Sequence, residues 1–165
     1  MPTLAVFSRE FVLDLCDGED VVATEILYFL RLKGYGAAIT PTVGHSLVDM
    51  ANVDQNKLAM QALFKLREPS PLLLAPQLTP VQHGYAEQAV NALMAKLDLP
   101  EHMKNVALII AEAAVLESRF LILDDAELEE LDVSKINPIL SGQGLATLQI
   151  FDRTHFYGLI SGQRV

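Results

Sequence analysis

The stretch MKNVALIIAEAAVLESRFLILDD, residues 103–125, decides the fold that this sequence predicts. From Met103 to Leu116, eleven of fourteen residues are apolar. A helix that is apolar on nearly every side lies inside a globular protein. The continuous apolar run Phe120–Leu123 is typical of a strand covered on both faces, and it ends at Asp124 and Asp125. We therefore expect a buried helix and then a buried strand that delivers two carboxylates to the sheet edge where α/β proteins bind ligands.

The composition is that of a globular chain with one core. The 165 residues are long enough for a single domain spanning 1–165, and 51% of them are hydrophobic. The net charge of −9 argues against broad nucleic-acid binding, because the 12 Lys and Arg residues form no basic stripe. One cysteine, Cys16, excludes an internal disulfide and fits a reducing compartment such as the cytoplasm. The first residues do not read as a signal peptide, and no apolar run is long enough to span a membrane.

Strand and helix patterns alternate along the rest of the chain. Apolar runs predict strands at Leu4–Phe7, Ala37–Ile39, Leu72–Ala75 and Leu148–Phe151. Helical spacing, capping residues and Gly or Pro punctuation predict helices at Glu10–Cys16, Val21–Lys33, Pro41–Met50, Asp54–Arg67, Thr79–Leu97, Glu127–Leu131 and His155–Ile160. This alternation predicts a three-layer α/β/α sandwich with a mainly parallel central sheet.

The order of these elements and their local amino-acid sequences resemble the PIN domain, the fold of metal-dependent ribonucleases that includes the VapC toxins. The stretches that carry the resemblance are Val6–Asp14, Ile39–Leu47, Asn105–Ala113, Phe120–Asp125 and Leu148–Ile160. The resemblance places the four acidic positions of the family on Ser8, His45, Val106 and Asp125, so one acid in four remains. It implies that these four positions converge at the carboxyl edge of the sheet. Such a site would hold Mg²⁺ or Mn²⁺ through oxygen ligands, which valine cannot supply.

Asp125, with Asp124 beside it, is the main catalytic candidate, and Asp125 is the candidate metal ligand. The alternative is that the two aspartates cap the helix that follows. His45, one turn before Asp49, is either a metal ligand or proton shuttle, or a hydrogen-bonded helix residue without catalytic duty. His102 has the same two interpretations, with exposure at a helix start as the plainer one.

Other acids offer substitutes for the lost ligands. Glu10 and Asp14 can bring a carboxylate towards Ser8, although both also fit ordinary acids of a helix surface. Glu112, on the buried helix, needs a partner, and a structural ion pair is the first expectation. The segment Ser141–Gly144 predicts a turn, because neither a lysine nor a helix start follows its glycines.

Three functions remain open at this point. The first is a PIN-like protein with an impaired site that acts through binding of RNA or a protein partner. The second is an Mg²⁺- or Mn²⁺-dependent ribonuclease whose site is rebuilt from the remaining acids. The third is a structural partner in a homo-oligomer or in a toxin–antitoxin-type complex.

Overall fold

The computed structural model describes residues 2–18, 20–68 and 73–162. Within these residues the strands β1 (Leu4–Phe7), β2 (Gly36–Ala38), β3 (Phe120–Ile122) and β4 (Gln149–Phe151) form one sheet. Its strand order is β2-β1-β3-β4, and every pairing is parallel. The register places Val6 opposite Ala38 on one side and opposite Leu121 on the other. The strand Phe120–Leu123 that the sequence predicts near the centre of the sheet is therefore an interior strand, flanked by β1 and β4.

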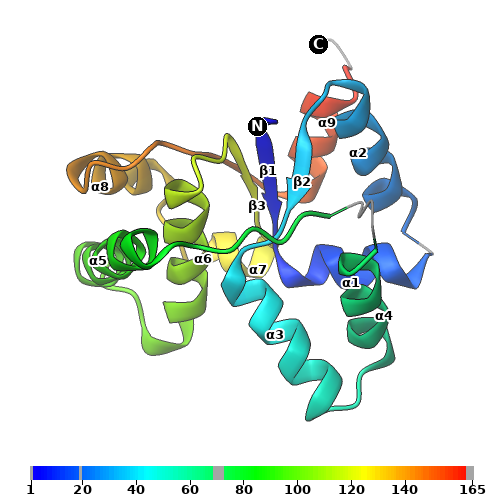
Figure 1. Cartoon of the computed structure of the whole chain (residues 1–165). Helices are drawn as coiled ribbons and strands as arrows, with labels where there is room; N and C mark the ends of the chain where they lie inside the picture. Colours follow the sequence, from blue (N-terminus) through cyan, green and yellow to red (C-terminus); the bar gives the residue numbers. More distant parts are fainter. Residues whose placement is uncertain (1, 19, 69–72, 163–165) are drawn as a thin grey trace.

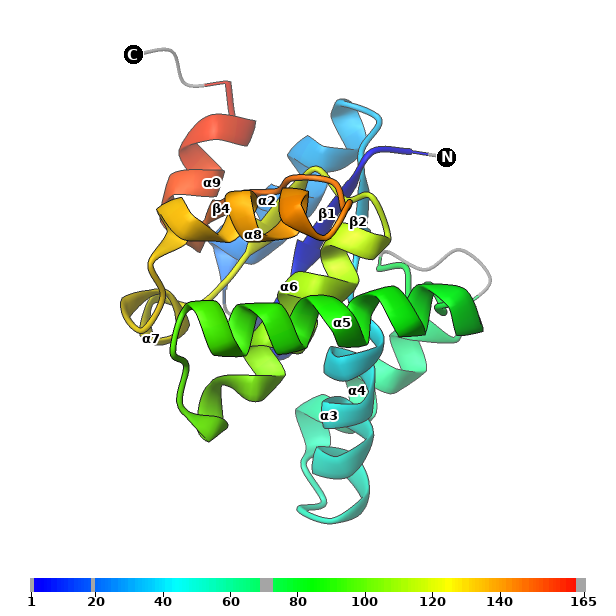
Figure 2. The same cartoon turned by 90° about the vertical axis from the view of Figure 1, so that its left-hand side faces the viewer.

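Helices cover both faces of this sheet, which confirms the three-layer α/β/α sandwich (Figures 1 and 2). One layer contains α5 (Pro80–Lys96), α6 (Lys104–Val115) and α8 (Ile136–Gly142). The other contains α1 (Arg9–Asp17), α2 (Val21–Leu32) and α9 (Arg153–Ile160). The helices α3 (Pro41–Asn52) and α4 (Lys57–Leu66) pack on each other and extend from the carboxyl edge of the sheet (Figure 1). The short helix α7 (Asp125–Glu129) and the 3-10 turns Glu101–Met103 and Val133–Lys135 complete the order.

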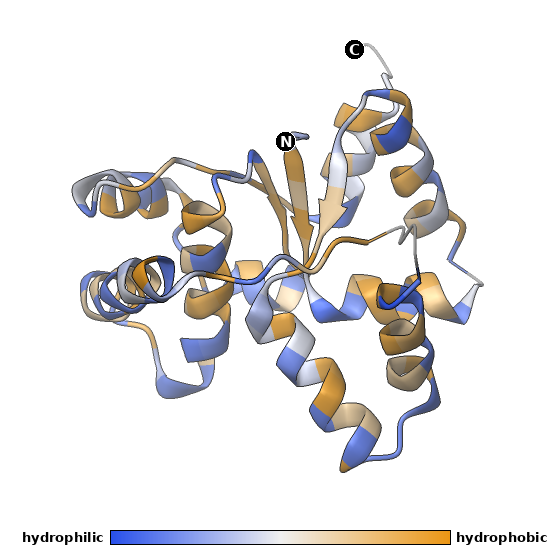
Figure 3. Cartoon of the chain, viewed as in Figure 1, coloured by the Kyte–Doolittle hydropathy of each residue, from blue (hydrophilic) through white to orange (hydrophobic). Residues whose placement is uncertain are grey.

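The helix α6 is buried from Val106 to Val115, apart from the partly buried Leu108, in keeping with its apolar sequence. Ile110 and Ala107 are fully buried, and the charged residue Glu112 is buried among them. The helix packs against α5 and α3, so it joins the outer helical layer to the carboxyl edge of the sheet. In Figure 3 the central strand β1 is coloured as hydrophobic, in keeping with its four buried side chains. No described helix is long and apolar enough to cross a membrane.

Several helices begin or end at the capping residues that the sequence predicts. Thr79 and Gln82 form the predicted capping box, in which the Thr79 hydroxyl accepts from the Gln82 N–H at 3.2 Å. The Gln82 side chain in turn accepts from the Thr79 N–H at 2.9 Å. Gly34 follows α2 with φ of +73°, a left-handed conformation that glycine adopts without strain.

Several local predictions need correction. Residues Leu73–Ala75 form no strand, because only Leu74 bridges Ala38, while Leu72 lies outside the described residues. The predicted turn at Ser141–Gly144 is partly helical, since α8 runs to Gly142. Its buried residues Ile136, Ile139 and Leu140 follow helical spacing, and tertiary packing on α5 stabilises them. The helix α7 begins two residues before the predicted Glu127, directly after the strand-end aspartate.

We expect the replacement Ile110→Ala to lower the free energy of unfolding by about 2–5 kcal/mol, because it leaves a cavity in a closed core. Leu108→Ala removes the same number of carbon atoms from the same helix, but Leu108 is only partly buried. Its cost should therefore be clearly smaller. Urea denaturation of the two variants measures both values, and equal costs would contradict the burial of α6 described above.

Candidate functional site

The first contact of the site joins the ends of the two central strands. Because β1 and β3 run parallel and in register, Ser8 and Asp124 leave the sheet at the same edge. The Ser8 N–H donates to the Ile122 carbonyl at 3.2 Å and so continues the β1–β3 ladder. The Ser8 hydroxyl then donates to Asp124 Oδ1 at 3.1 Å. Of the two strand-end aspartates, Asp124 is therefore the one that faces Ser8.

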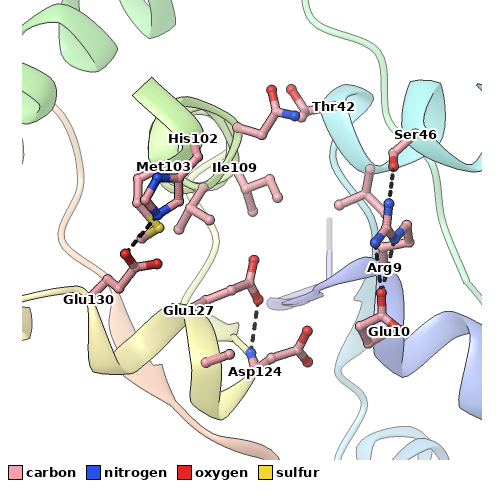
Figure 4. A pocket seen from close by; sticks show the side chains of 14 residues that line it. Arg9, Glu10, Thr42, Ser46, His102, Met103, Ile109, Asp124, Glu127 and Glu130 are labelled. Atoms are coloured by element: carbon pink, nitrogen blue, oxygen red, sulfur yellow. Dashed lines mark hydrogen bonds and ion pairs between the residues drawn. The ribbon is translucent and has the colours of Figure 1, made fainter. Parts of the chain in front are cut away.

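A cavity of about 310 Å³, here called the α6-side cavity, opens next to this contact (Figure 4). Its carboxylates come from Glu10, Asp124, Glu127 and Glu130. Its other polar side chains are Arg9, Thr42, Ser46, His102 and Asn105, and its apolar wall contains Val43, Met103, Val106 and Ile109. The site thus draws on α1, on α3 and on the region of α6 and α7, three parts of the chain that are far apart in the sequence.

Arg9 crosses from α1 to α3 inside this cavity. Its Nε and Nη2 donate to Glu10 Oε1 at 3.1 and 2.9 Å, and its Nη1 donates to Ser46 Oγ at 2.9 Å (Figure 4). The side chains of Arg9 and Glu10 are 42% and 47% exposed, so water screens their attraction. The guanidinium therefore fixes the relative positions of two side chains more than it stabilises the fold.

Asp124 and Glu127 are a carboxyl pair whose proton affinities are raised. Burial raises the pKa of Asp124 above 3.8, the bond from Ser8 opposes the rise, and the charge of Glu10 adds to it. Burial also raises the pKa of Glu127 above 4.5, and the bond from the Asp124 N–H opposes it. That bond, to Glu127 Oε1 at 3.0 Å, is the helix cap that begins α7. Asp124 thus has the capping position that the sequence suggested as the alternative to a catalytic role.

Asp125 lies on the other side of Asp124. It lines a second cavity of about 320 Å³, here called the α9-side cavity, together with Ser8, Glu10, Asp14 and Arg153. Arg153 Nη1 donates to Asp14 Oδ2 at 2.8 Å and to Asp20 Oδ2 at 2.5 Å, and its guanidinium lies over the Phe11 ring. Asp14 is therefore bound by an arginine that joins α9 to α1 and α2. Glu10, by contrast, lines both the α6-side and the α9-side cavity.

Of the four positions that the resemblance aligns, three lie around these two cavities and one does not. Ser8 and Asp125 line the α9-side cavity, and Val106 lines the α6-side cavity. His45 instead lines a separate hollow between α3 and α4. Successive helix residues point about 100° apart, so Thr42 and Ser46, one turn apart, face the site while His45 faces away. His45 therefore lines neither of the two cavities around which the other three positions lie.

His102 and Glu112, two further candidates from the sequence, both have structural partners. His102 lines the α6-side cavity and pairs with Glu130 at 2.7 Å, although its side chain is 64% exposed. Glu112 accepts a hydrogen bond from the Thr42 N–H at 3.1 Å. The partner of this buried acid is thus the N-terminus of α3, where a negative charge is favourable, and not the cation that we expected. Thr40 occupies the N-cap position, but its hydroxyl makes no capping bond.

The donor set fits a divalent metal ion poorly. Mg²⁺ and Mn²⁺ require several oxygen ligands around one point. Within the described ranges, no group of three acid, histidine or cysteine side chains is close enough together to hold an ion. The Glu10 carboxylate is bound to Arg9, the Asp124 carboxylate accepts from Ser8, and Val106 provides only carbon atoms.

Sequence reasoning missed the residues Arg9, Thr42, Ser46 and Glu127. A signal for Glu127 was present, because an acid three residues after Asp124 is the pattern of a capping box. The spacing of Thr42 and Ser46 marks one face of a helix, but nothing local shows which face meets the sheet edge.

Comparison with known proteins supports the fold and adds nothing about the site. No protein-family model and no curated protein sequence matches this chain. Among solved structures, the chain is similar to VapBC2 from Rickettsia felis bound to a DNA fragment from their promoter. The TM-score is 0.60 at 16% sequence identity, over 90% of this chain and 98% of that chain. This likeness confirms the PIN-like fold that the sequence resemblance implied.

The raised pKa values predict a pH dependence of stability. A folded protein that binds a proton more tightly than the unfolded chain loses stability as that proton leaves. The contribution of Asp124 and Glu127 is therefore full below their unfolded pKa values and falls as pH rises through the raised ones. We expect Asp124→Asn to gain stability relative to wild type as pH rises from about 4 to 7. Urea denaturation at several pH values measures this difference. The neighbouring variant Asp125→Asn is the control, and a flat difference for Asp124→Asn would contradict the prediction.

Proposed function

We propose that this chain is a PIN-like protein that acts through binding and that its site is impaired for metal-dependent cleavage of RNA. The observation that carries the proposal is the contact between Ser8 and Asp124. A neutral hydroxyl donates to the strand-end carboxylate at the place where the resemblance expects a second acid. Two-metal cleavage needs carboxylates that hold ions about 4 Å apart. The apolar side chain of Val106 and the engagement of Glu10 by Arg9 further support an impaired site.

A protein partner is the favoured ligand, and a second copy of this chain is the first candidate. The similar structure is of VapBC2 bound to a DNA fragment from their promoter. Val21, Tyr28 and Leu32 are 66%, 58% and 64% exposed. Their spacing on α2 places them on one face of the helix. An apolar helix face of this kind supports protein association. RNA is the alternative ligand.

A second candidate function is a ribonuclease with a rebuilt site that uses Mg²⁺ or Mn²⁺. The observation that favours it is that Glu10, Asp124 and Glu127 line one cavity and that the charge of Glu10 raises the pKa of both other acids. Perturbed carboxyls in a cleft mark functional sites in many enzymes. This candidate needs Arg9 to release Glu10. A toxin–antitoxin-type role as a structural partner remains compatible with the binding proposal.

The decisive assay is cleavage of single-stranded RNA with Mg²⁺ and then with Mn²⁺. We expect no metal-dependent cleavage by the wild-type protein above the background of the variants Asp124→Ala and Asp125→Ala. These two variants are a matched pair, since of the two aspartates it is Asp124 that accepts the hydrogen bond from Ser8. Robust cleavage that Asp124→Ala abolishes would overturn the impaired site and establish the rebuilt-site enzyme. Cleavage that both variants retain would come from a contaminant.

Light scattering after size exclusion tests the association. We expect a mass above that of the 18.1 kDa chain at micromolar concentration. The double variant Tyr28→Glu, Leu32→Glu should lower this mass, because it places charges on the apolar face of α2. Phe64→Glu is the control, since Phe64 is also an exposed apolar residue but lies on α4. A monomeric wild-type protein would remove self-association and leave a different protein or RNA as the ligand.

A further inference from the structure

A cluster of positive charges lies at the amino edge of the sheet, opposite to the two cavities described above. Arg31 and Lys33 are at the C-terminal end of α2, and Arg119 directly precedes β3. All three residues are exposed, and within residues 2–18, 20–68 and 73–162 none of them forms an ion pair with an acid. The chain as a whole has 21 acidic residues and a net charge of −9. These three residues, here called the amino-edge cluster, therefore reverse the charge of the surface locally.

The three cations lie around Tyr35, which follows α2 and precedes β2 at the upper end of the sheet in Figure 1. Lys33, Tyr35 and Arg119 line a hollow of about 150 Å³ together with Gln149. Arg31 lines a second hollow, which also contains Tyr35. In the described part of the chain, no acid lines either hollow. The cluster is thus a concave cationic surface with a phenol and an amide beside it.

Arg119 is fixed at this place by its backbone and by its side chain. Its N–H donates to the Leu4 carbonyl at 3.0 Å, and its carbonyl accepts from the Gln149 N–H at 2.9 Å. Its guanidinium carbon lies 5.0 Å from the centroid of the Phe120 ring, and its Nη1 donates to the Tyr35 hydroxyl at 3.4 Å. An arginine that stacks on a ring and binds no acid keeps N–H groups for a ligand. The planar fork of these groups matches the oxygens of a phosphate.

Helix ends at this edge account for part of the cluster but not for Arg119. The C-terminal ends of α2 and α9 lie here, since Lys33 and Ile160 line one hollow. Each helix C-terminus carries roughly half a negative charge, which favours cations such as Arg31 and Lys33. Arg119 is on no helix, and the acid closest to it in sequence, Glu117, lines neither hollow. Three full positive charges exceed two half charges, so the surface remains attractive to an anion.

We propose that the amino-edge cluster binds a phosphate group, with the Arg119 fork on its oxygens and with Lys33 and Arg31 supplying further positive charge. Pockets that enclose a whole small molecule measure about 300–1,000 Å³, so a hollow of about 150 Å³ suits one group of a ligand. Three cations are also too few to follow a long nucleic-acid backbone. This site is independent of the proposed function, because it lies at the other edge of the sheet and shares no residue with the two cavities there.

The test is a titration of the full chain with inorganic phosphate, followed by the backbone amide signals in NMR spectra. We expect saturable shifts at Tyr35 and Phe120, and no such shifts with sodium chloride at the same ionic strength. Arg119→Gln should weaken phosphate binding about tenfold, the effect of losing a hydrogen bond to a charged group. Lys33→Gln should weaken it less, because an exposed lysine contributes only as a screened point charge.

Lys96→Gln is the matched control for net charge, since Lys96 is also an exposed lysine at the end of a helix but belongs to α5. Absence of saturable shifts in the wild-type protein would overturn the inference whether or not the variants fold. Phosphate affinity that Arg119→Gln leaves unchanged, or that Lys96→Gln lowers equally, would overturn it too.

Two sources can supply the phosphate group, a small phosphorylated compound or the end of an RNA strand. A short single-stranded RNA with and without a 5′-phosphate distinguishes them. Tighter binding of the phosphorylated RNA than of inorganic phosphate, lost in Arg119→Gln, would support the site and assign it to RNA ends. Equal binding of the phosphorylated RNA and inorganic phosphate would support a small compound. Neither result depends on metal-dependent cleavage, so the proposed function is tested separately.

Discussion

The parallel pairing of β1 with β3 is the constraint on which the rest of the structure depends. Both strands are buried on each face, so their backbone groups must bond to each other, and the pairing of Phe7 with Ile122 sets the register. The ladder continues to Ser8, whose N–H bonds to the Ile122 carbonyl. Because the strands are parallel, the residues that follow them meet at one edge. The contact of Ser8 with Asp124 is a direct consequence of this register.

The buried helix α6 connects the core to this edge. Its first turn supplies Val106 to the wall of the α6-side cavity, and Glu112, deeper in the protein, binds the N-terminus of α3. A buried carboxylate without a partner costs several kcal/mol, so this bond also fixes how α3 leaves the sheet. The direction of α3 in turn decides that Thr42 and Ser46 face the site. One acid that we first took for half of an ion pair thus orients one wall of the site.

The chemistry of the site follows from what its acids already bind. Asp124 accepts from Ser8 and begins α7 with Glu127, Glu10 is held by Arg9, and Asp14 is held by Arg153. Carboxylates that are engaged with protein donors have fewer oxygen lone pairs for an ion. A PIN-like fold can therefore keep its sheet, its layers and its cavity while the charges inside are balanced within the chain. This is the physical basis for separating the fold from the cleavage activity that the resemblance implied.

The sequence by itself determined the layers of this protein. A stretch as rich in apolar residues as 103–116 is typical of a helix in the core, Phe120–Leu123 is typical of an inner strand, and the Thr79 cap needs only its own helix. Only the tertiary structure decided which of two neighbouring aspartates faces Ser8, that Ser46 and not His45 faces the cavity, and that Arg9 reaches across it. Residues next to each other in the chain point in different directions. Which of two neighbouring residues faces the site therefore decides which groups meet there. The apolar and capping patterns of the sequence do not distinguish between the two.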